Sequence, residues 1–195
     1  MKIIGITGTS GSGKTTLSRI LNEREDVKVI DADKVVKEMS IPGTEYLDSI
    51  KSTFGNNYFF SDGNLNRKEL AQKIYTDSDA RENLNKLTFK YVVNEILERI
   101  KNINNEKIKI VVIDAPLLFE SGLEECCDYV VSLIADEDLK IKRICKRDNI
   151  DEETAKCRLN IQNEDSYYIE KSDFIIYNTK NCDLKSEIEK IFMSI

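Results

Sequence analysis

The chain has 195 residues, of which 41% are hydrophobic, and its formal net charge is −6. This length predicts one domain, or one domain with insertions, that buries a sizeable core. The acidic balance argues against a nucleic-acid partner, while a local basic groove for a small anion is compatible with it. Histidine is absent, which excludes every mechanism with an imidazole base and leaves proton transfer to a carboxylate.

The five cysteines show no C-x-x-C spacing, and no histidine is present to complete a zinc site. Their odd number argues against a disulfide framework, and Met1-Lys2 leads straight into an apolar run instead of a signal peptide. No apolar run approaches the roughly 20 residues that a membrane span needs. We therefore expect reduced thiols in a soluble, cytoplasmic protein with no membrane partner. The oligomeric state has no sequence signal.

The first predicted element is a buried strand over residues 3–7, followed by a glycine-rich segment and an amphipathic helix that contains Leu17. The segment Gly8-Thr9-Ser10-Gly11-Ser12-Gly13-Lys14-Thr15 fits the P-loop pattern G-x-x-x-x-G-K-[ST]. Its glycines let backbone N–H groups wrap around phosphate oxygens, and the helix N-terminus adds partial positive charge. Lys14 is expected at the β/γ-phosphates, and the Thr15 hydroxyl is expected to ligate Mg²⁺.

A plain Gly/Ser linker does not usually place Lys-Thr between a buried strand and an amphipathic helix. We therefore expect the chain to bind a nucleoside triphosphate. The expected contacts in this segment are Gly11, Ser12, Gly13, Lys14, Thr15 and Thr16.

A second buried strand is predicted over residues 27–30, and Asp31-Ala32-Asp33 follows it. Ligands of open α/β sheets bind outside the carboxyl ends of the strands, so these carboxylates are expected at the phosphate site. Asp31 fits two roles equally well, the N-cap of the next helix or a metal or water ligand. Asp33 is the better candidate for the base that accepts the hydroxyl proton of the phosphate acceptor.

The interval from residue 30 to residue 108 is much longer than one crossover helix requires. It contains helical patterns at 46–53, 68–75 and 81–103, interrupted by Pro42-Gly43, Phe54-Gly55 and Asp62-Gly63. We interpret it as a helical insertion over the open edge of the site.

Three further strands are predicted at residues 108–113, 129–134 and 174–177. Asp114 closes the first of them and resembles a Walker B aspartate, which either holds Mg²⁺ through water or orients the P-loop. Strands that alternate with helices predict an α/β fold with a doubly wound, five-stranded parallel sheet.

Two charged helices are predicted at residues 137–146 and 151–162. They form either a solvated surface or a lid whose arginines, Arg143 and Arg147, clamp the triphosphate. We favour the lid, because kinase lids are hinged between core strands. The single kinase domain then comprises a core of about 1–32, 105–135 and 170–195, a helical insertion of about 33–104 and a lid of about 136–169.

The chain resembles the dephospho-coenzyme A kinase family over nearly its whole length. Each matching segment is weak alone, but their order and spacing are specific, and residues 116–120 are the most telling after the P-loop. The segments are the P-loop, Asp31-Ala32-Asp33, Pro42-Gly43, Phe54-Gly55, Asp62-Gly63-Asn64-Leu65-Asn66-Arg67, Leu84-Asn85, Pro116-Leu117-Leu118-Phe119-Glu120, Arg143 with Arg147-Asp148, Arg158 with Gln162, and Asp173-Phe174-Ile175-Ile176 followed by Asn178.

The resemblance implies transfer of the ATP γ-phosphoryl group to the ribose 3′-hydroxyl of dephospho-coenzyme A with Mg²⁺, the final step of coenzyme A biosynthesis. It implies that Asp33 is the general base. From the P-loop motif and the lid interpretation, we expect Lys14 and Arg143 as further catalytic groups. The resemblance also implies that the helical insertion holds the acceptor and that the arginine-bearing helices close as a lid. Arg67 is implied as a contact for acceptor phosphates, with a surface arginine as the equally open alternative.

Two departures from the family concern the acceptor more than ATP. Phe89-Lys90 stands where the family usually has His-Pro, so Lys90 or Tyr91 would have to replace that histidine. Gly8-Thr9-Ser10-Gly11 stands where the family more often has Gly-Gly-Ile-Gly, and it is similar to the loop of uridine kinases.

Two alternatives to this function stay open, another small-molecule P-loop kinase and a nucleotide-dependent switch. A guanine-specific switch would offer Asn-Lys-x-Asp at a strand end. The nearest string, Asn85-Lys86-Leu87-Thr88, lacks the aspartate and lies inside a predicted helix. This difference favours ATP.

Overall fold

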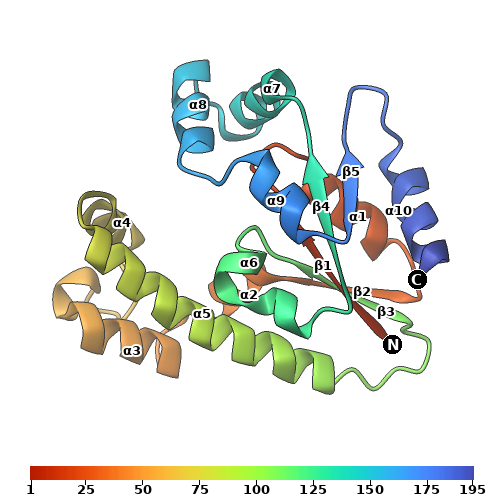
Figure 1. Cartoon of the computed structure of the whole chain (residues 1–195). Helices are drawn as coiled ribbons and strands as arrows, with labels where there is room; N and C mark the ends of the chain where they lie inside the picture. Colours follow the sequence, from red (N-terminus) through yellow and green to blue (C-terminus); the bar gives the residue numbers. More distant parts are fainter. The chain divides into compact units, whose positions relative to one another are not determined.

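The computed structural model describes all residues, 1–195, which divide into two compact units (Figure 1). The first unit comprises Met1–Ile30 and Asn105–Ile195, and the second comprises Asp31–Asn104. Each unit encloses its own cluster of buried apolar side chains. None of the helices combines the length and the apolar character that crossing a membrane requires.

The sheet of the first unit has five parallel strands in the order β2-β3-β1-β4-β5, which confirms the predicted fold class. Ile4 pairs with Val112 on one side of β1 and with Tyr129 on the other. The strands are β1 (Lys2–Thr7), β2 (Val27–Asp31), β3 (Ile110–Asp114), β4 (Tyr129–Ile134) and β5 (Phe174–Tyr177). The third strand begins two residues later than predicted, because the Ile108 amide donates to Asn105 O at 3.0 Å in a turn.

Helices cover both faces of this sheet. Side chains alternate between the faces of a strand, so Ile4 and Ile6 of β1 face one side, where they join a cluster with Leu17 of α1 and Ile188 of α10. On the other side the space beside Gly5 is filled by Leu118 of α6. Figure 1 shows α1 beside α10 and, across the sheet, α6 and α9. The helices are α1 (Lys14–Asn22), α6 (Leu118–Ser121), η2 (Leu123–Cys126, a 3₁₀ turn), α7 (Glu137–Asp148), α8 (Glu152–Asn160), α9 (Asp165–Lys171) and α10 (Leu184–Ser194).

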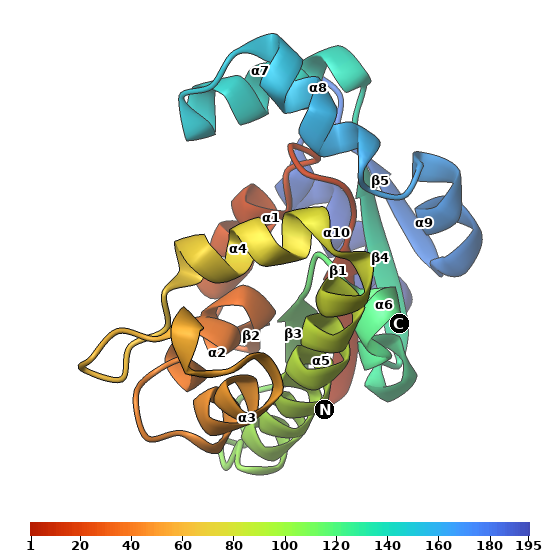
Figure 2. The ribbon, with the colours of Figure 1, turned by 90° about the vertical axis from the view of Figure 1, so that its left-hand side faces the viewer.

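The second unit is helical and packs around Tyr46, Leu47, Ile50 and Leu70. A short hairpin, in which Phe59 pairs with Leu65, adds its apolar side chains to this core. Figure 2 shows the same helices from the side. They are α2 (Ala32–Met39), α3 (Glu45–Phe54), η1 (Asn56–Tyr58, a 3₁₀ turn), α4 (Arg67–Thr76) and α5 (Ser78–Lys101).

Side-chain caps fix where these helices begin. The Asp77 carboxylate accepts from the Ala80 amide at 2.9 Å, so α5 begins at Ser78 and not at the predicted residue 81. The same helix runs uninterrupted through Phe89-Lys90 for 24 residues. A proline at the second of these positions would remove one helical hydrogen bond and bend the helix, so the departure from the family pattern favours a continuous α5.

Candidate active site

The P-loop connects β1 to α1 at the carboxyl end of the strand. Gly8, Gly11 and Gly13 adopt positive φ angles of 130°, 78° and 112°, which side chains disfavour. The Lys14 ammonium donates to the carbonyl oxygens of Gly8 and Thr9, so it lies within the curve of the loop. Two buried hydroxyls of the loop, Thr9 Oγ1 and Ser12 Oγ, have no hydrogen-bond partner in the protein. Buried polar groups normally find one, and phosphate oxygens would supply acceptors here.

Asn178, near the C-terminus, binds a carbonyl oxygen of the loop. The Asn178 amide donates from Nδ2 to Ser12 O at 2.7 Å, and its backbone N–H donates to Ile134 O, also at 2.7 Å. A Cβ atom on Gly13 would lie 2.1 Å from that Nδ2 atom. Gly13 is therefore required for space as well as for its left-handed backbone. The bond to the Ser12 carbonyl oxygen therefore fixes the end of the loop that leads into α1.

The predicted lid helices contact the same loop. The Arg143 guanidinium on α7 donates to Gly11 O at 3.0 Å and to Ser12 O at 3.4 Å. Gln162, which follows α8, accepts from the Ser10 amide at 2.9 Å. The loop glycine at 11 permits this approach, because a Cβ there would lie 2.7 Å from Lys140 O of α7.

Arg147 lies one turn beyond Arg143 and is exposed. It binds Asp148 through two hydrogen bonds of 2.7 and 2.9 Å, and Arg158 of α8 donates to the same carboxylate at 2.5 Å. The hydrogen bond from Arg147 lowers the pKa of Asp148. These charges thus hold α7 and α8 together, while the lid role of Arg147 stays a prediction.

The candidate metal ligands flank the first turn of α1. Asp114 is 9% exposed at the end of β3 and accepts a hydrogen bond from the Ser18 hydroxyl. Thr15 is exposed at the start of α1. No group of three or more Cys, Asp or Glu residues that could hold a metal is present. Mg²⁺ in phosphotransferases binds through one or two protein oxygens plus waters and phosphates, so this sparse donor set fits it.

The remaining predicted residues belong to the second unit. Asp31 is the N-cap of α2 and accepts from the Lys34 amide at 2.9 Å. Asp33 lies in the first turn of that helix and is exposed. Arg67 is the first residue of α4 and is also exposed. Of the two roles predicted for Asp31, the structure therefore shows the N-cap, which requires no metal.

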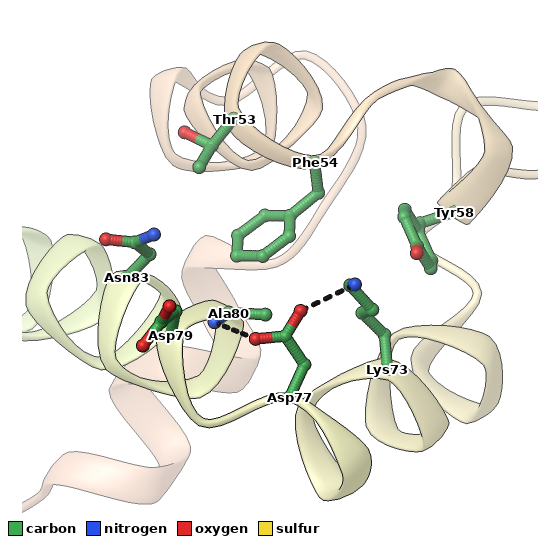
Figure 3. Close-up of a pocket in the computed structure, with 8 residues that line it drawn as sticks. All are labelled: Thr53, Phe54, Tyr58, Lys73, Asp77, Asp79, Ala80 and Asn83. Carbon is green, nitrogen blue, oxygen red and sulfur yellow. Dashed lines mark hydrogen bonds and ion pairs between the residues drawn. The ribbon is translucent and has the colours of Figure 1, made fainter.

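A pocket of about 290 Å³ opens in the second unit between α3, η1, α4 and the start of α5 (Figure 3). Two of its charged groups pair with each other, since Lys73 Nζ lies 2.6 Å from Asp77 Oδ2, while Asp77 Oδ1 accepts from the Ala80 amide in the cap of α5. None of the predicted site residues lines it. Its walls are formed by Thr53, Phe54, Tyr58, Lys73, Asp77, Asp79, Ala80 and Asn83.

Sequence reasoning gave no role to Ser18, Gln162 or Asn178. The last two belong to segments quoted for the family resemblance, which marks their positions but not their contacts. Ser18 had a usable signal, because it lies one helical turn after Thr15 on a helix whose start was known.

A five-stranded parallel sheet with a P-loop after its first strand, a Walker B-like aspartate and an arginine against the loop defines a P-loop kinase. The family model described as dephospho-CoA kinase matches residues 2–183. The chain belongs to the dephospho-CoA kinase family, whose members are ATP-dependent phosphotransferases.

Individual relatives match this chain over 83% or more of their own length. The chain is 35% identical to a dephospho-CoA kinase of Fusobacterium nucleatum, over 99% of this chain and 98% of that protein. It is 31% identical to one of Saccharomyces cerevisiae, over 100% of this chain and 83% of that protein. The solved structure of dephospho-CoA kinase from Campylobacter jejuni superimposes with a TM-score of 0.70 at 29% identity, covering 98% of this chain and 96% of that one.

Proposed function

We propose that this chain transfers the γ-phosphoryl group of ATP to the ribose 3′-hydroxyl of dephospho-CoA, which yields ADP and coenzyme A. The observation that carries the proposal is the P-loop with its two unpartnered buried hydroxyls and its enclosed Lys14. Phosphoryl transfer needs positioning and charge stabilisation more than covalent help from the protein, and the loop offers both.

Each group near the loop has a proposed role. The amides of Gly11, Ser12, Gly13 and Lys14 bind phosphate oxygens, with Thr15 and Thr16 at the helix start, and the Lys14 ammonium stabilises the charge of the transferring group. Arg143 adds a second cation from the lid. Arg147 is proposed to reach ATP from the same helix when the lid closes.

Thr15 and Asp114 would hold Mg²⁺, Asp114 directly or through water, and the ion would neutralise phosphate charge. Ser18 would keep the Asp114 carboxylate oriented through the hydrogen bond that it donates.

Asp33 is proposed to accept the proton of the attacking hydroxyl. It follows the carboxyl end of β2 by two residues, and acceptors of open α/β sheets bind at that end of the strands. Arg67, exposed at the first position of α4, is proposed to contact acceptor phosphates.

We further propose a cytoplasmic location, with ATP and dephospho-CoA as its small-molecule partners. The five cysteines, an odd number without C-x-x-C spacing, fit a reducing compartment.

The test is ADP release by the purified chain with ATP and Mg²⁺ against a panel of acceptors. The panel contains dephospho-CoA, uridine, cytidine and nucleoside monophosphates. Among these acceptors, we expect turnover only with dephospho-CoA. We expect no turnover when Mg²⁺ is removed with a chelator. Faster turnover with a nucleoside would overturn the acceptor assignment while leaving the P-loop kinase chemistry in place.

A further inference from the structure

Two adjacent cysteines lie outside the candidate active site, at the turn between α6 and β4. Cys126 ends the 3₁₀ turn η2, and Cys127 is its C-cap. Both are free and partly buried. Both thiols donate to one oxygen, Leu123 O, from Cys126 Sγ at 2.9 Å and from Cys127 Sγ at 3.3 Å. Because they share this acceptor, the two sulfurs lie on the same side of the turn.

The backbone explains this convergence. Neighbouring side chains on a regular strand point to opposite faces. Here the chain switches from the 3₁₀ turn to an extended backbone at Cys127, with φ −91° and ψ 139°, and the switch brings the sulfurs together. The sheet leaves room for the second sulfur, since a Cβ on Gly5 would lie only 3.0 Å from Cys127 Sγ.

The contact makes the two thiols chemically unequal. Contact with Cys127 lowers the pKa of Cys126, while the same contact together with burial raises the pKa of Cys127. Because the thiolate is the nucleophile, Cys126 is the sulfur that reacts first. Cys127 is then held beside the reacting atom. The other cysteines, Cys145, Cys157 and Cys182, have no cysteine next to them in the chain.

We propose that Cys126 and Cys127 form a dithiol site for organic trivalent arsenicals. In the reaction with an arsenoxide, R–As=O, two As–S bonds form and the oxygen leaves as water with the two thiol protons. The arsenic stays trivalent, so no oxidant is needed. The second bond forms within one molecule, and such chelation raises the apparent affinity over a single thiol by about 10²–10⁴-fold.

The test treats the purified full-length chain with phenylarsine oxide in the presence of excess glutathione and measures the intact mass. We expect one arsenical per chain, which the dithiol 2,3-dimercaptopropanol removes and glutathione does not. Cys126→Ser and Cys127→Ser should each abolish the stable adduct. Cys157→Ser, at an exposed position on α8, is the matched control and should keep it.

Several results would overturn the proposal. They are the absence of a stable adduct on the unmodified chain, an adduct that survives in either single variant, or one that disappears in the Cys157→Ser control. Thermal unfolding of each variant checks the fold. If Cys127→Ser is unfolded, Cys126→Ser and Cys126→Ala decide the question, because the sulfur that lies next to Gly5 is that of Cys127.

Discussion

Substitution of Asp33 tests its proposed role as the general base. Asp33→Asn is nearly isosteric and removes the proton acceptor, and a general base contributes about 10²–10⁴-fold to turnover. We expect kcat with dephospho-CoA to fall by about 10²-fold and the affinity for ATP to stay near that of the unmodified enzyme. Asp31→Asn is the matched control, since asparagine also caps helices well. A decrease of less than about threefold in kcat would reject Asp33 as the base.

Lys14 donates to loop carbonyls and is proposed to stabilise the charge of the transferring phosphoryl group. Lys14→Ala should remove most phosphoryl transfer, by about 10²–10³-fold in kcat, as loss of one preorganised charge-stabilising donor does. The melting temperature should change little, because the ammonium is not part of the apolar core. Steady-state kinetics and thermal unfolding measure the two effects. Near-normal turnover in the folded variant would show that this loop is not the phosphate site.

Asn178 is predicted to act on ATP only through the loop. Asn178→Ala removes the 2.7 Å donor of Ser12 O, which keeps only the longer bond from Arg143, and the loss of a typical hydrogen bond costs about 0.5–1.5 kcal/mol. If the loop then relaxes, the Kd for ATP should rise about 2- to 13-fold, while the KM for dephospho-CoA stays constant. Asn94→Ala, exposed on α5, serves as the control in the same titration. Equal changes for both substrates would indicate a general structural defect instead.

At the scale of elements, the sequence was most informative where the signal is local. The predicted limits of β4 and β5 agree with the structure. Both are largely apolar runs that begin directly after an aspartate, Asp128 or Asp173. Where the predicted start of a helix is wrong by a few residues, a side-chain cap sets the real start, as Asp77 does for α5. The short helix α6 has four residues and no side-chain cap, so its limits had no sequence signal.

The contacts that support the P-loop could not be predicted from local sequence patterns. The loop itself was readable, since its glycines, Lys14 and Thr15 are contiguous. Its supports come from distant segments: Asn178 is 166 residues from Ser12, and Gln162 is 152 residues from Ser10. Such pairings depend on the order of strands in the sheet and not on spacing in the chain.

The two arginines of α7 test whether the charged helices act as a lid. Arg143 spans two loop carbonyls, whereas Arg147 is exposed and paired with Asp148. Both Arg143→Ala and Arg147→Ala should lower turnover with little change in melting temperature, and Arg143→Ala should cost more, about 10²-fold in kcat. Arg143→Lys should not restore turnover, because the ammonium of lysine lacks the planar set of donors that a guanidinium offers. Lys142→Ala, exposed on the same helix, is the control. Full activity in both arginine variants would make the charged helices a solvated surface.

For the whole molecule, the absence of histidine shapes the pH dependence of stability. Histidine is the side chain whose ordinary pKa lies between about pH 5 and 8. Carboxylates with a lowered pKa carry the acid dependence: hydrogen bonds from Arg24 lower the pKa of Asp26, and those from Arg147 lower that of Asp148. Hydrogen bonding from Lys73 does the same for Asp77.

A carboxylate whose pKa is lower in the folded state stabilises the fold fully above its unfolded pKa of about 3.9, and this contribution is lost as the pH falls through the folded value. The free energy of unfolding should therefore stay nearly constant between about pH 5.5 and 7 and should fall below about pH 4. Urea unfolding at a series of pH values measures this profile. Asp26→Asn should make the acid limb shallower, because it removes one of the titrating groups. A step in stability near pH 6 to 7 would contradict the argument, since no side chain identified here would account for it.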